Sequence, residues 1–446
     1  MDLEARIKEQ KSLEARLRKQ GKEQLGIEID RSIGAGGMSE GVFKAYNAIG
    51  KPVVAKYTRV SEEQPIFTSY KAEEALPPER VIPVHIDYFP GNSNSDASIT
   101  ILNEDQNDEK HRGNYFVYEL TDNYADHKTE SMLQFVVSEK ECLKILQEAE
   151  SDIDPRERLI IDFEDNQFFT ADNHLYHELL LEHGATPSLG EFHNKEGGMS
   201  LDTVYDVGRQ MCDILDLLSS EDIVHRDIKP DNLLIDPQTK RLKLIDFGIA
   251  QTNGKKHHSS PMDVLWLLAK ISLTKNKFIG TPLYAAREIY QCLNLDITNS
   301  LDKKPEITTK ADVYSSGRIM CELLGVPIWD SSYFGNMGSY KESHMQNISA
   351  YMLGNGIPYP LAETVKDLIH PDPDERDYER FRLVVEAGPN KTVFLPPKGS
   401  LIHAGDDQKT RIQDTLSYSS VDELPPRITL VEKDLPKTII ESSYIN

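Results

Sequence analysis

Residues 225–232 of this chain read His-Arg-Asp-Ile-Lys-Pro-Asp-Asn, and residues 246–248 read Asp-Phe-Gly. These two stretches decide how the sequence is interpreted. Between them, two apolar runs at 233–235 and 242–245 (the second broken by Lys243) flank a Pro-Gln-Thr turn. This pattern predicts a β-hairpin, which would bring the acidic ends of the two stretches together.

The acidic and amide side chains of these stretches suit phosphoryl transfer. That reaction needs a carboxylate to orient the attacking hydroxyl, and further oxygen ligands to hold Mg²⁺ on the nucleotide phosphates. Asp227 can accept the hydroxyl proton, while Asn232 and Asp246 can hold the metal ion.

In this spacing the two stretches resemble the catalytic loop and metal-binding motif of eukaryotic-like (Hanks-type) serine/threonine protein kinases. The resemblance covers about residues 27–385. It implies an α+β fold of two lobes, with a small β-rich lobe at about 27–182 and a larger helical lobe at about 183–385. It also implies transfer of the γ-phosphoryl group of ATP to protein serine and threonine hydroxyls, with Mg²⁺ (Mn²⁺ as an alternative) and with autophosphorylation.

A glycine-rich stretch lies near the start of the small lobe, at residues 33–45. It predicts a strand, a turn and a strand, in which glycine lets backbone N–H groups approach phosphate oxygens. The stretch is similar to that of bacterial members of the family. It differs by one extra residue, so that the third glycine position becomes Ser39 or Glu40. The nucleotide-binding residues expected here are Ile33, Gly34, Gly36, Gly37, Ser39 and Val42.

The rest of the nucleotide site follows from the resemblance. Lys56, after the β-branched run at 53–54, would bind the α- and β-phosphates, with Ala55 beside the nucleotide. From Glu182 to His225 is 43 residues (225 − 182), about what the family needs between its hinge and its catalytic loop. The gatekeeper, hinge and adenine-site residues implied are Leu181, Glu182, Gly184 and Leu234.

The family's lysine is held by a carboxylate on the next helix, and two candidates are present. Glu139 lies in residues 138–146, whose apolar spacing suits a helix. Glu73 or Glu74 is closer to Lys56 along the chain. Glu139 is favoured because strand-like residues follow it in the expected order, at 159–163 and 174–181.

Choosing Glu139 implies an insertion at about 61–130. It contains three strand-like runs, 81–89, 98–102 and 115–120, and an acidic run at 103–110. A loop of this length without structure is uncommon, so the sequence predicts an added β-rich subdomain with one flexible acidic loop.

The larger lobe carries further matches. Residues 202–218 have helical periodicity. Residues 312–317 match the helix whose aspartate holds the catalytic-loop backbone, and Glu288 would form a buried structural pair with Arg376.

Residues near the substrate suggest which hydroxyls are phosphorylated. Lys229, two residues after Asp227, is typical of kinases that act on serine and threonine, and its cation can stabilise the transferring phosphoryl group. Residues 280–284 resemble the substrate-facing loop, in which Thr281 would bond Asp227 and Lys229. The catalytic residues expected are Asp227, Lys229, Lys56, Glu139 and Thr281.

The segment between Asp246 and Glu288 suggests regulation. In the family, Arg226 pairs with a phosphorylated activation loop. The apolar run at 261–271 is compatible with a helix that docks on the small lobe in a resting state, docks on a partner, or simply packs on the large lobe. We predict a resting state in which 264–271 packs against the domain and partly blocks the site, and autophosphorylation that releases it. The candidate acceptors are Thr252, Ser259, Ser260, Ser272 and Thr274.

Composition limits the partners. Lys and Arg total 50 and Asp and Glu total 73, a net charge of −23. Such a surface repels nucleic acid and anionic lipid, which favours protein substrates, basic ones among them. The four cysteines form no Cys-x-x-Cys pair, so a reducing compartment is expected: the cytoplasm, or a host's cytoplasm for a secreted effector. The sequence contains no run of about 18 apolar residues, so no membrane span is expected.

The flanks are less informative. Residues 1–26 predict a solvated leader helix, or alternatively a docking or dimerisation helix. Residues 386–446 form a C-terminal extension with strand-like runs at 391–395 and 428–431, either wrapped on the domain or partly disordered. The sequence leaves the oligomeric state open.

Two other functions remain open on the same fold. The first is an inactive scaffold that binds nucleotide. It requires that the extra residue in the glycine-rich stretch, or a misplaced Glu139, abolishes catalysis. A kinase of small molecules is disfavoured by Lys229 and by residues 280–282, which serve peptide hydroxyls.

Overall fold

A computed structural model describes residues 3–34, 39–60, 80–89, 97–104, 115–120, 124–172, 174–184, 186–252, 281–289, 307–334, 341–393 and 395. Several expectations lie outside these residues: the apolar run at 261–271, the alternative carboxylates Glu73 and Glu74, and the strand-like run at 428–431.

The small lobe is built on one antiparallel sheet of eight strands, in the order β1-β2-β3-β8-β7-β4-β5-β6. The strands are β1 (Glu28–Gly34), β2 (Gly41–Tyr46), β3 (Pro52–Arg59), β4 (Ile82–Phe89), β5 (Ala97–Asn103), β6 (Tyr115–Leu120), β7 (Phe163–Ala171) and β8 (His174–Glu182).

The insertion supplies β4, β5 and β6, close to the three runs predicted as strands. They do not form a subdomain of their own, because β4 pairs with β7 and thereby extends the lobe's own sheet. The physical reason is that β7 would otherwise present a row of unpaired backbone groups at the sheet edge. Ile82, Val84 and Ile101 of the added strands are buried against the helix that follows them.

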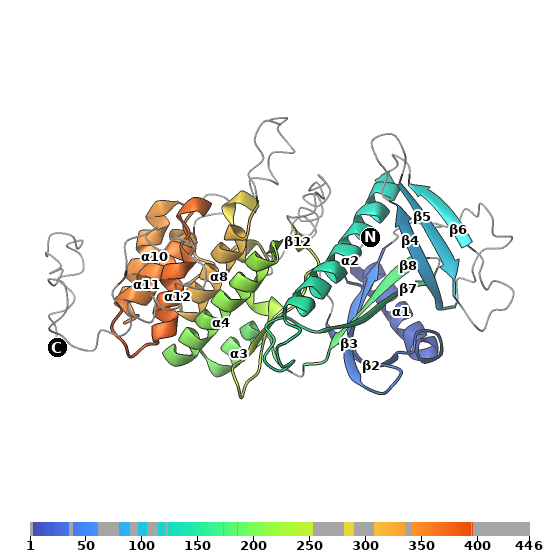
Figure 1. Ribbon diagram of the computed structural model, residues 1–446, viewed down its shortest axis with the longest axis horizontal. Helices are drawn as coiled ribbons and strands as arrows, with labels where there is room; N and C mark the ends of the chain where they lie inside the picture. The colour runs from blue at the N-terminus through green and yellow to red at the C-terminus, as the bar shows by residue number, and fades with distance from the viewer. Residues whose placement is uncertain are drawn as a thin grey trace. The chain divides into compact units, whose positions relative to one another are not determined.

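That helix, α2 (Tyr124–Ala149), and the leader helix α1 (Leu3–Gln24) cover opposite faces of the sheet (Figure 1). α2 begins at Tyr124, inside the region assigned to the insertion. α1 is not solvated: Leu13 and Leu17 are 2% and 1% exposed and pack against Phe43 and Tyr57. A narrow leucine stripe is enough here because the sheet supplies the larger part of the apolar surface.

The strand expected at 159–163 is wrong, since β7 begins only at Phe163. Residues 159–161 find backbone partners in the large lobe instead. The N–H of Leu244 donates to Leu159 O at 2.7 Å, and the N–H of Ile161 donates to Leu244 O at 3.1 Å. These bonds tie the two lobes together behind the hinge.

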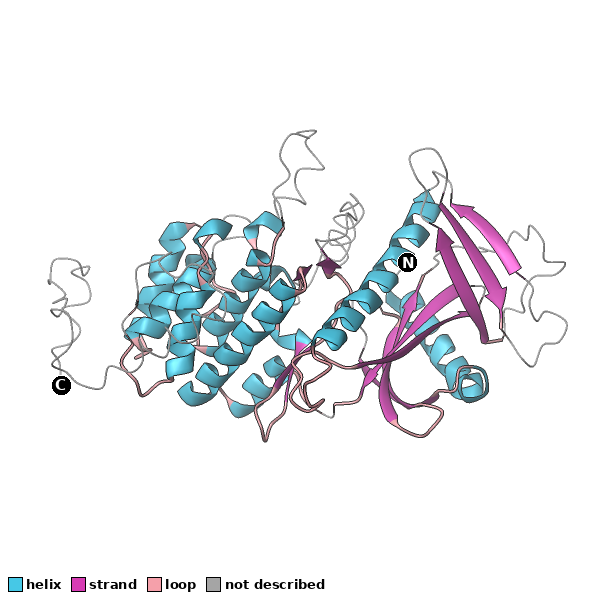
Figure 2. Cartoon of the chain, in the orientation of Figure 1, coloured by secondary structure: helices cyan, strands magenta, loops and turns pink. Residues whose placement is uncertain are grey.

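The large lobe is mainly helical (Figure 2). Its elements are α3 (Leu189–Glu196), α4 (Leu201–Ser220), α6 (Thr281–Tyr284), α8 (Lys310–Leu323), α9 (Ser331–Phe334), α10 (Glu342–Gly354), α11 (Tyr359–Leu368), α12 (Tyr378–Ala387), the 3₁₀ turns η1 (Pro230–Asn232) and η2 (Pro373–Glu375), and the strand pairs β9 (Ile223–Val224) with β12 (Gln251–Thr252) and β10 (Leu233–Ile235) with β11 (Leu242–Leu244).

α4 confirms the helix predicted at 202–218, and Ser200 caps it by accepting the N–H of Thr203. The predicted apolar face is buried: Val204, Val207, Met211, Ile214 and Leu218. In contrast, the described residues of 391–395 form no strand. Within the described residues, no helix is both long enough and apolar enough to cross a membrane.

Candidate active site

The backbone of the loop after β9 is held by one buried carboxylate. The N–H groups of His225 and Arg226 donate to the two oxygens of Asp312 in α8, at 2.7 and 2.8 Å. Burial raises the pKa of Asp312 to about 7, although both N–H bonds act in the opposite direction. Arg226 adopts a positive φ of 66°, a costly conformation that persists only where the surroundings impose it. Asp312 supplies that restraint, as the sequence predicted.

Asp227 lies at the centre of this loop and is 4% exposed. Lys229 Nζ donates to its Oδ2 at 2.7 Å. Asn232 Nδ2 donates to the main-chain oxygen of Asp227 at 2.9 Å and to Oδ2 at 3.1 Å. Because the amide nitrogen of Asn232 makes both bonds, its amide oxygen is the atom that remains to bind a metal ion.

The predicted hairpin is confirmed as β10 and β11, with Leu233 opposite Leu244. The N–H of Ile245 donates to the main-chain oxygen of Asn232 at 2.9 Å. The hairpin thus brings Asn232 beside the residue before Asp246, although the two acidic stretches are fourteen residues apart (246 − 232).

Lys56 joins both lobes at this point. Its Nζ lies 2.6 Å from Glu139 Oε1 on α2 and 2.8 Å from Asp246 Oδ1. Burial by itself lowers the pKa of Lys56, but the carboxylates of Asp246 and Glu139 outweigh burial, so the pKa is raised above its ordinary value. Lys56 therefore stays positively charged at any physiological pH.

Residues after Asp246 are held by α2 and by the catalytic loop. Phe247 is fully buried, with its ring centroid 4.8 Å from that of His225. Ser138 of α2 donates to Ala250 O at 3.4 Å. The side chain of Arg226 donates to Ile249 O at 2.5 Å and to Gln251 Oε1 at 3.1 Å. Arg226 was expected to bind a phosphate group. In this conformation its guanidinium donates to a main-chain oxygen and to a side-chain amide instead.

The face of the sheet that carries Lys56 follows from the strand registers. Val42 lies opposite Lys56, and Val54 lies opposite Leu181, so these four side chains share one face. Ala55 is on the other face, in the core under α1. Ala55, expected beside the nucleotide, therefore does not share the face of Lys56, whereas Val54 does, because side chains alternate along a strand. The sequence alone could have indicated this, because Val54 lies two residues before Lys56 and residues two apart on a strand share a face.

The hinge region lies against the floor of the site. A Cβ built on Gly184 would lie 3.9 Å from Leu234 Cδ1. The carboxylate of Glu182 accepts a bond from Lys243 Nζ of β11, so a large-lobe cation restrains the hinge. Lys243 was not among the residues predicted for the site.

The structure describes some of the remaining predicted residues, which belong to the glycine-rich stretch and to the substrate-facing loop. Ile33, 47% exposed, and Gly34 end β1, and Ser39 is buried just before β2. Gly36 and Gly37 lie outside the described residues, as does the side chain of Thr281, whose backbone begins α6.

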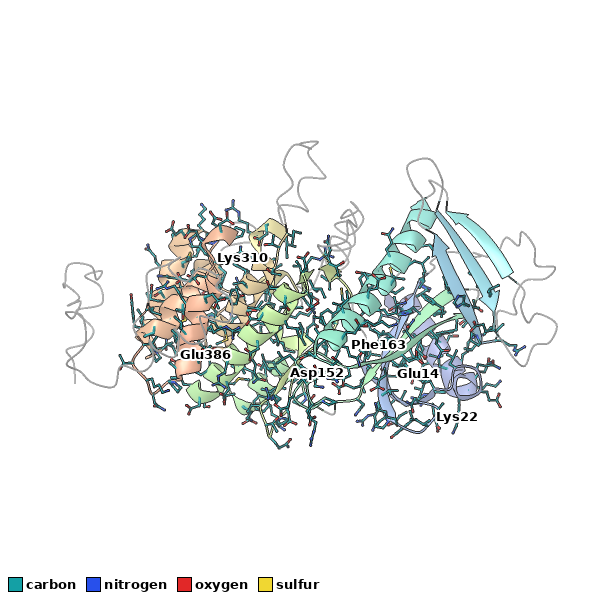
Figure 3. All side chains as sticks on the ribbon, in the orientation of Figure 1. Glu14, Lys22, Asp152, Phe163, Lys310 and Glu386 are labelled. Atoms are coloured by element: carbon teal, nitrogen blue, oxygen red, sulfur yellow. The ribbon has the colours of Figure 1, made fainter. Side chains whose placement is uncertain are left out.

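The predicted pair between Glu288 and Arg376 is present. Arg376 NH1 and NH2 donate to the two carboxylate oxygens at 2.6 and 2.9 Å. Arg376 NH1 also donates to Lys310 O at 2.7 Å, and Nε donates to His370 O at 2.8 Å. Such a bidentate, hydrogen-bonded pair fixes the end of the segment that begins at Asp246; Lys310 is labelled in Figure 3.

Comparison with known proteins decides the family. The family description "Protein kinase domain" matches residues 116–378. The chain belongs to the protein kinase family. The match starts within β6, the last of the added strands. Members of this family use ATP and a divalent metal ion.

Individual kinases similar to this chain come from distant organisms. A putative serine/threonine-protein kinase of Mycoplasma pneumoniae is 28% identical over 151 residues, covering 33% of this chain and 35% of that protein. The probable serine/threonine-protein kinase fhkD of Dictyostelium discoideum is 25% identical over 278 residues, covering 60% of this chain and 32% of that protein. The aligned regions thus span about a third of these relatives' length.

Proposed function

We propose that this chain is an ATP-dependent serine/threonine protein kinase. One observation supports it most strongly: the part-buried Lys56 of β3 contacts Glu139 of α2 and Asp246 at 2.6 and 2.8 Å. This cluster joins the small lobe to the segment proposed to bind the metal ion. In the family, the lysine and the motif aspartate must both be in place for transfer.

This function assigns a role in phosphoryl transfer to each of three charged residues of the site. Asp227 orients the substrate hydroxyl and accepts its proton. Lys229, 2.7 Å from that carboxylate, stabilises charge on the transferring phosphoryl group. Lys56 binds the α- and β-phosphates, between Val42 and Val54 of the roof and Leu234 of the floor.

A metal ion fits this site by the chemistry of its donors. The amide oxygen of Asn232 and the carboxylate of Asp246 are hard oxygen ligands, the kind that Mg²⁺ and Mn²⁺ prefer. We propose Mg²⁺ as the physiological ion. When bound, it neutralises charge on the phosphate oxygens.

The substrates we propose are proteins, and basic ones first, because the chain carries a net charge of −23. We also propose autophosphorylation between residues 247 and 281. The place of this activity would be the cytoplasm, since Cys142, Cys212 and Cys321 are buried free thiols.

The test is transfer from radiolabelled ATP and Mg²⁺ to a peptide library presenting serine, threonine or tyrosine. We expect transfer to serine and threonine, loss of transfer in Asp246→Ala, and a fall of several orders of magnitude in Asp227→Asn, which still binds nucleotide. Asp206→Asn, a half-exposed carboxylate on α4, is the matched control. Wild-type turnover in Asp227→Asn would refute these roles, and absence of transfer in the wild type would favour a scaffold.

A further inference from the structure

The strand that leads to the glycine-rich sequence is irregular and lies at a sheet edge. β1 pairs with β2 and ends the strand order. Its register shifts twice in seven residues, between Ile29 and Arg31 and between Ser32 and Gly34. Each shift leaves one residue of β1 out of the ladder, as a β-bulge does, and a bulge locally disrupts the pairing. The path of β1 therefore needs support from outside the ladder.

α1 gives that support through one side chain. Arg18 NH1 donates to Ile29 O at 3.1 Å and to Asp30 O at 2.8 Å, at the first bulge. Its Nε and NH2 donate to Glu14 Oε1 at 3.1 and 2.8 Å, one turn earlier on the helix. Glu14, labelled in Figure 3, thus orients the planar guanidinium toward the strand.

The helix that carries Arg18 is itself fixed to the sheet. Leu13 and Leu17 are in the core. Gln20 Oε1 accepts the N–H of Val81 at 2.8 Å, and Leu25 O accepts a bond from Gln167 Nε2 at 3.0 Å. Arg18 therefore extends from a helix that is packed against the sheet and hydrogen-bonded to its neighbours.

Strand registers connect this edge to the nucleotide site. Gly34, the last residue of β1, lies opposite Val42, and Val42 lies opposite Lys56. The ladder thus connects the end of β1 to Lys56 through a single residue of β2.

We propose that Arg18 is a positioning residue for the nucleotide: by holding the bulged β1 it sets where Gly34 and Val42 stand relative to Lys56. α1 is then part of the nucleotide-binding unit. This inference rests on the proposed function, because it requires that ATP binds beneath these strands.

The experiment compares Arg18→Ala and Arg18→Lys with Arg16→Ala in the full chain. Arg16 is the control because it lies on the same helix but pairs with Asp172, at the turn between β7 and β8. The readouts are the Kd of a fluorescent ADP analogue, the KM for ATP and kcat, the Tm, and hydrogen–deuterium exchange of residues 28–34.

Arg18→Ala should raise the Kd and the KM for ATP roughly threefold to tenfold, with kcat changed by less than about twofold. Exchange in β1 should rise. Arg18→Lys should recover part of the affinity, since an ammonium can still donate to a carbonyl of β1. Arg16→Ala should keep the wild-type Kd.

Wild-type nucleotide affinity in Arg18→Ala, even with a lower Tm, would overturn the inference and leave Arg18 a structural contact only. Equal losses of affinity in Arg18→Ala and Arg16→Ala would overturn it as well. If Arg18→Ala does not fold, Arg18→Lys against Arg16→Lys decides by the same criteria. A wild type that binds no ADP would overturn the proposed function together with the inference, whereas an active wild type with an unaffected Arg18 variant overturns the inference alone.

Discussion

Burial lowers the pKa of Lys56, whereas the carboxylates of Asp246 and Glu139 raise it. The carboxylates have the larger combined effect, so the pKa lies above its ordinary value. The arrangement depends on Glu139, which is 2% exposed and reaches Lys56 from the middle of α2. The helix is itself anchored at its end, where Glu150 accepts the N–H groups of Leu159 and Ile160 at 2.8 and 3.2 Å. The helix that carries Glu139 is therefore also held, at its end, by backbone groups of residues 159–160.

We expect Glu139→Gln to lower kcat/KM for ATP on the order of a hundredfold, much as Lys56→Met does, because a neutral amide no longer holds the lysine in place. Steady-state kinetics with a peptide substrate measure this. Glu148→Gln, an exposed position on the same helix, should behave as wild type. Unchanged kinetics in Glu139→Gln would show that another carboxylate holds Lys56.

A second residue-scale prediction concerns the buried Glu178. Tyr57 and Gln167 donate to its two oxygens at 2.5 and 2.6 Å. Burial raises its pKa from 4.5 to about 7, against the effect of these bonds. Since the folded state binds the proton more tightly, the contribution to stability is fully present below about pH 4.5 and is lost as the pH rises through about 7.

Glu178→Gln removes this titration, so the free energy of unfolding should depend less on pH between 4.5 and 7 than in the wild type. Urea denaturation at several pH values measures the difference. Glu196→Gln, exposed on α3, is the control. Parallel profiles for Glu178→Gln and wild type would contradict the raised pKa.

At the scale of elements, α1 is a structural part of the small lobe. Leu17 is 1% exposed in the core between α1 and the sheet. We expect Leu17→Ala to destabilise the protein by about 2 to 5 kcal/mol, from lost burial and the cavity left behind. Lys19→Ala, on the exposed side, should change stability by less than about 0.5 kcal/mol. Thermal and chemical denaturation measure both, and equal stability of the two variants would show that the helix is only loosely attached.

The elements also show where sequence patterns suffice. Helical periodicity specifies α4 locally because it repeats the period of helical geometry, and the apolar run at 179–181 of β8 indicates a buried strand. Residues 159–161 are equally apolar, yet they form no sheet strand. Their partners come from β11, about 80 residues later, and no local pattern reports such a partner.

At the scale of the whole molecule, the buried pair of Glu288 and Arg376 joins segments 88 residues apart. Removing one partner leaves a buried charge, so Arg376→Met should destabilise the protein by about 3 to 5 kcal/mol. The double variant Glu288→Leu/Arg376→Met should recover much of this loss, because neither charge is then left unpaired. A double-variant cycle by urea denaturation is the measurement. Additive losses would mean that the pair does not act as a unit.

The sequence by itself determined which residues are candidates for the chemistry. Asp227, Asn232 and Asp246 lie on short loops joined by a hairpin, so local spacing brings the first two together and predicts the third nearby. Lys56 and Glu139 could be proposed, but two other glutamates competed for the same role.

Only the tertiary structure decided which glutamate reaches Lys56, which face Ala55 occupies, and what α1 covers. Each of these depends on contacts between residues far apart in the chain, where burial and hydrogen bonding of one element are set by another. The added strands show the same limit: their alternation predicts strands, whereas the open edge of β7 determines which sheet they join.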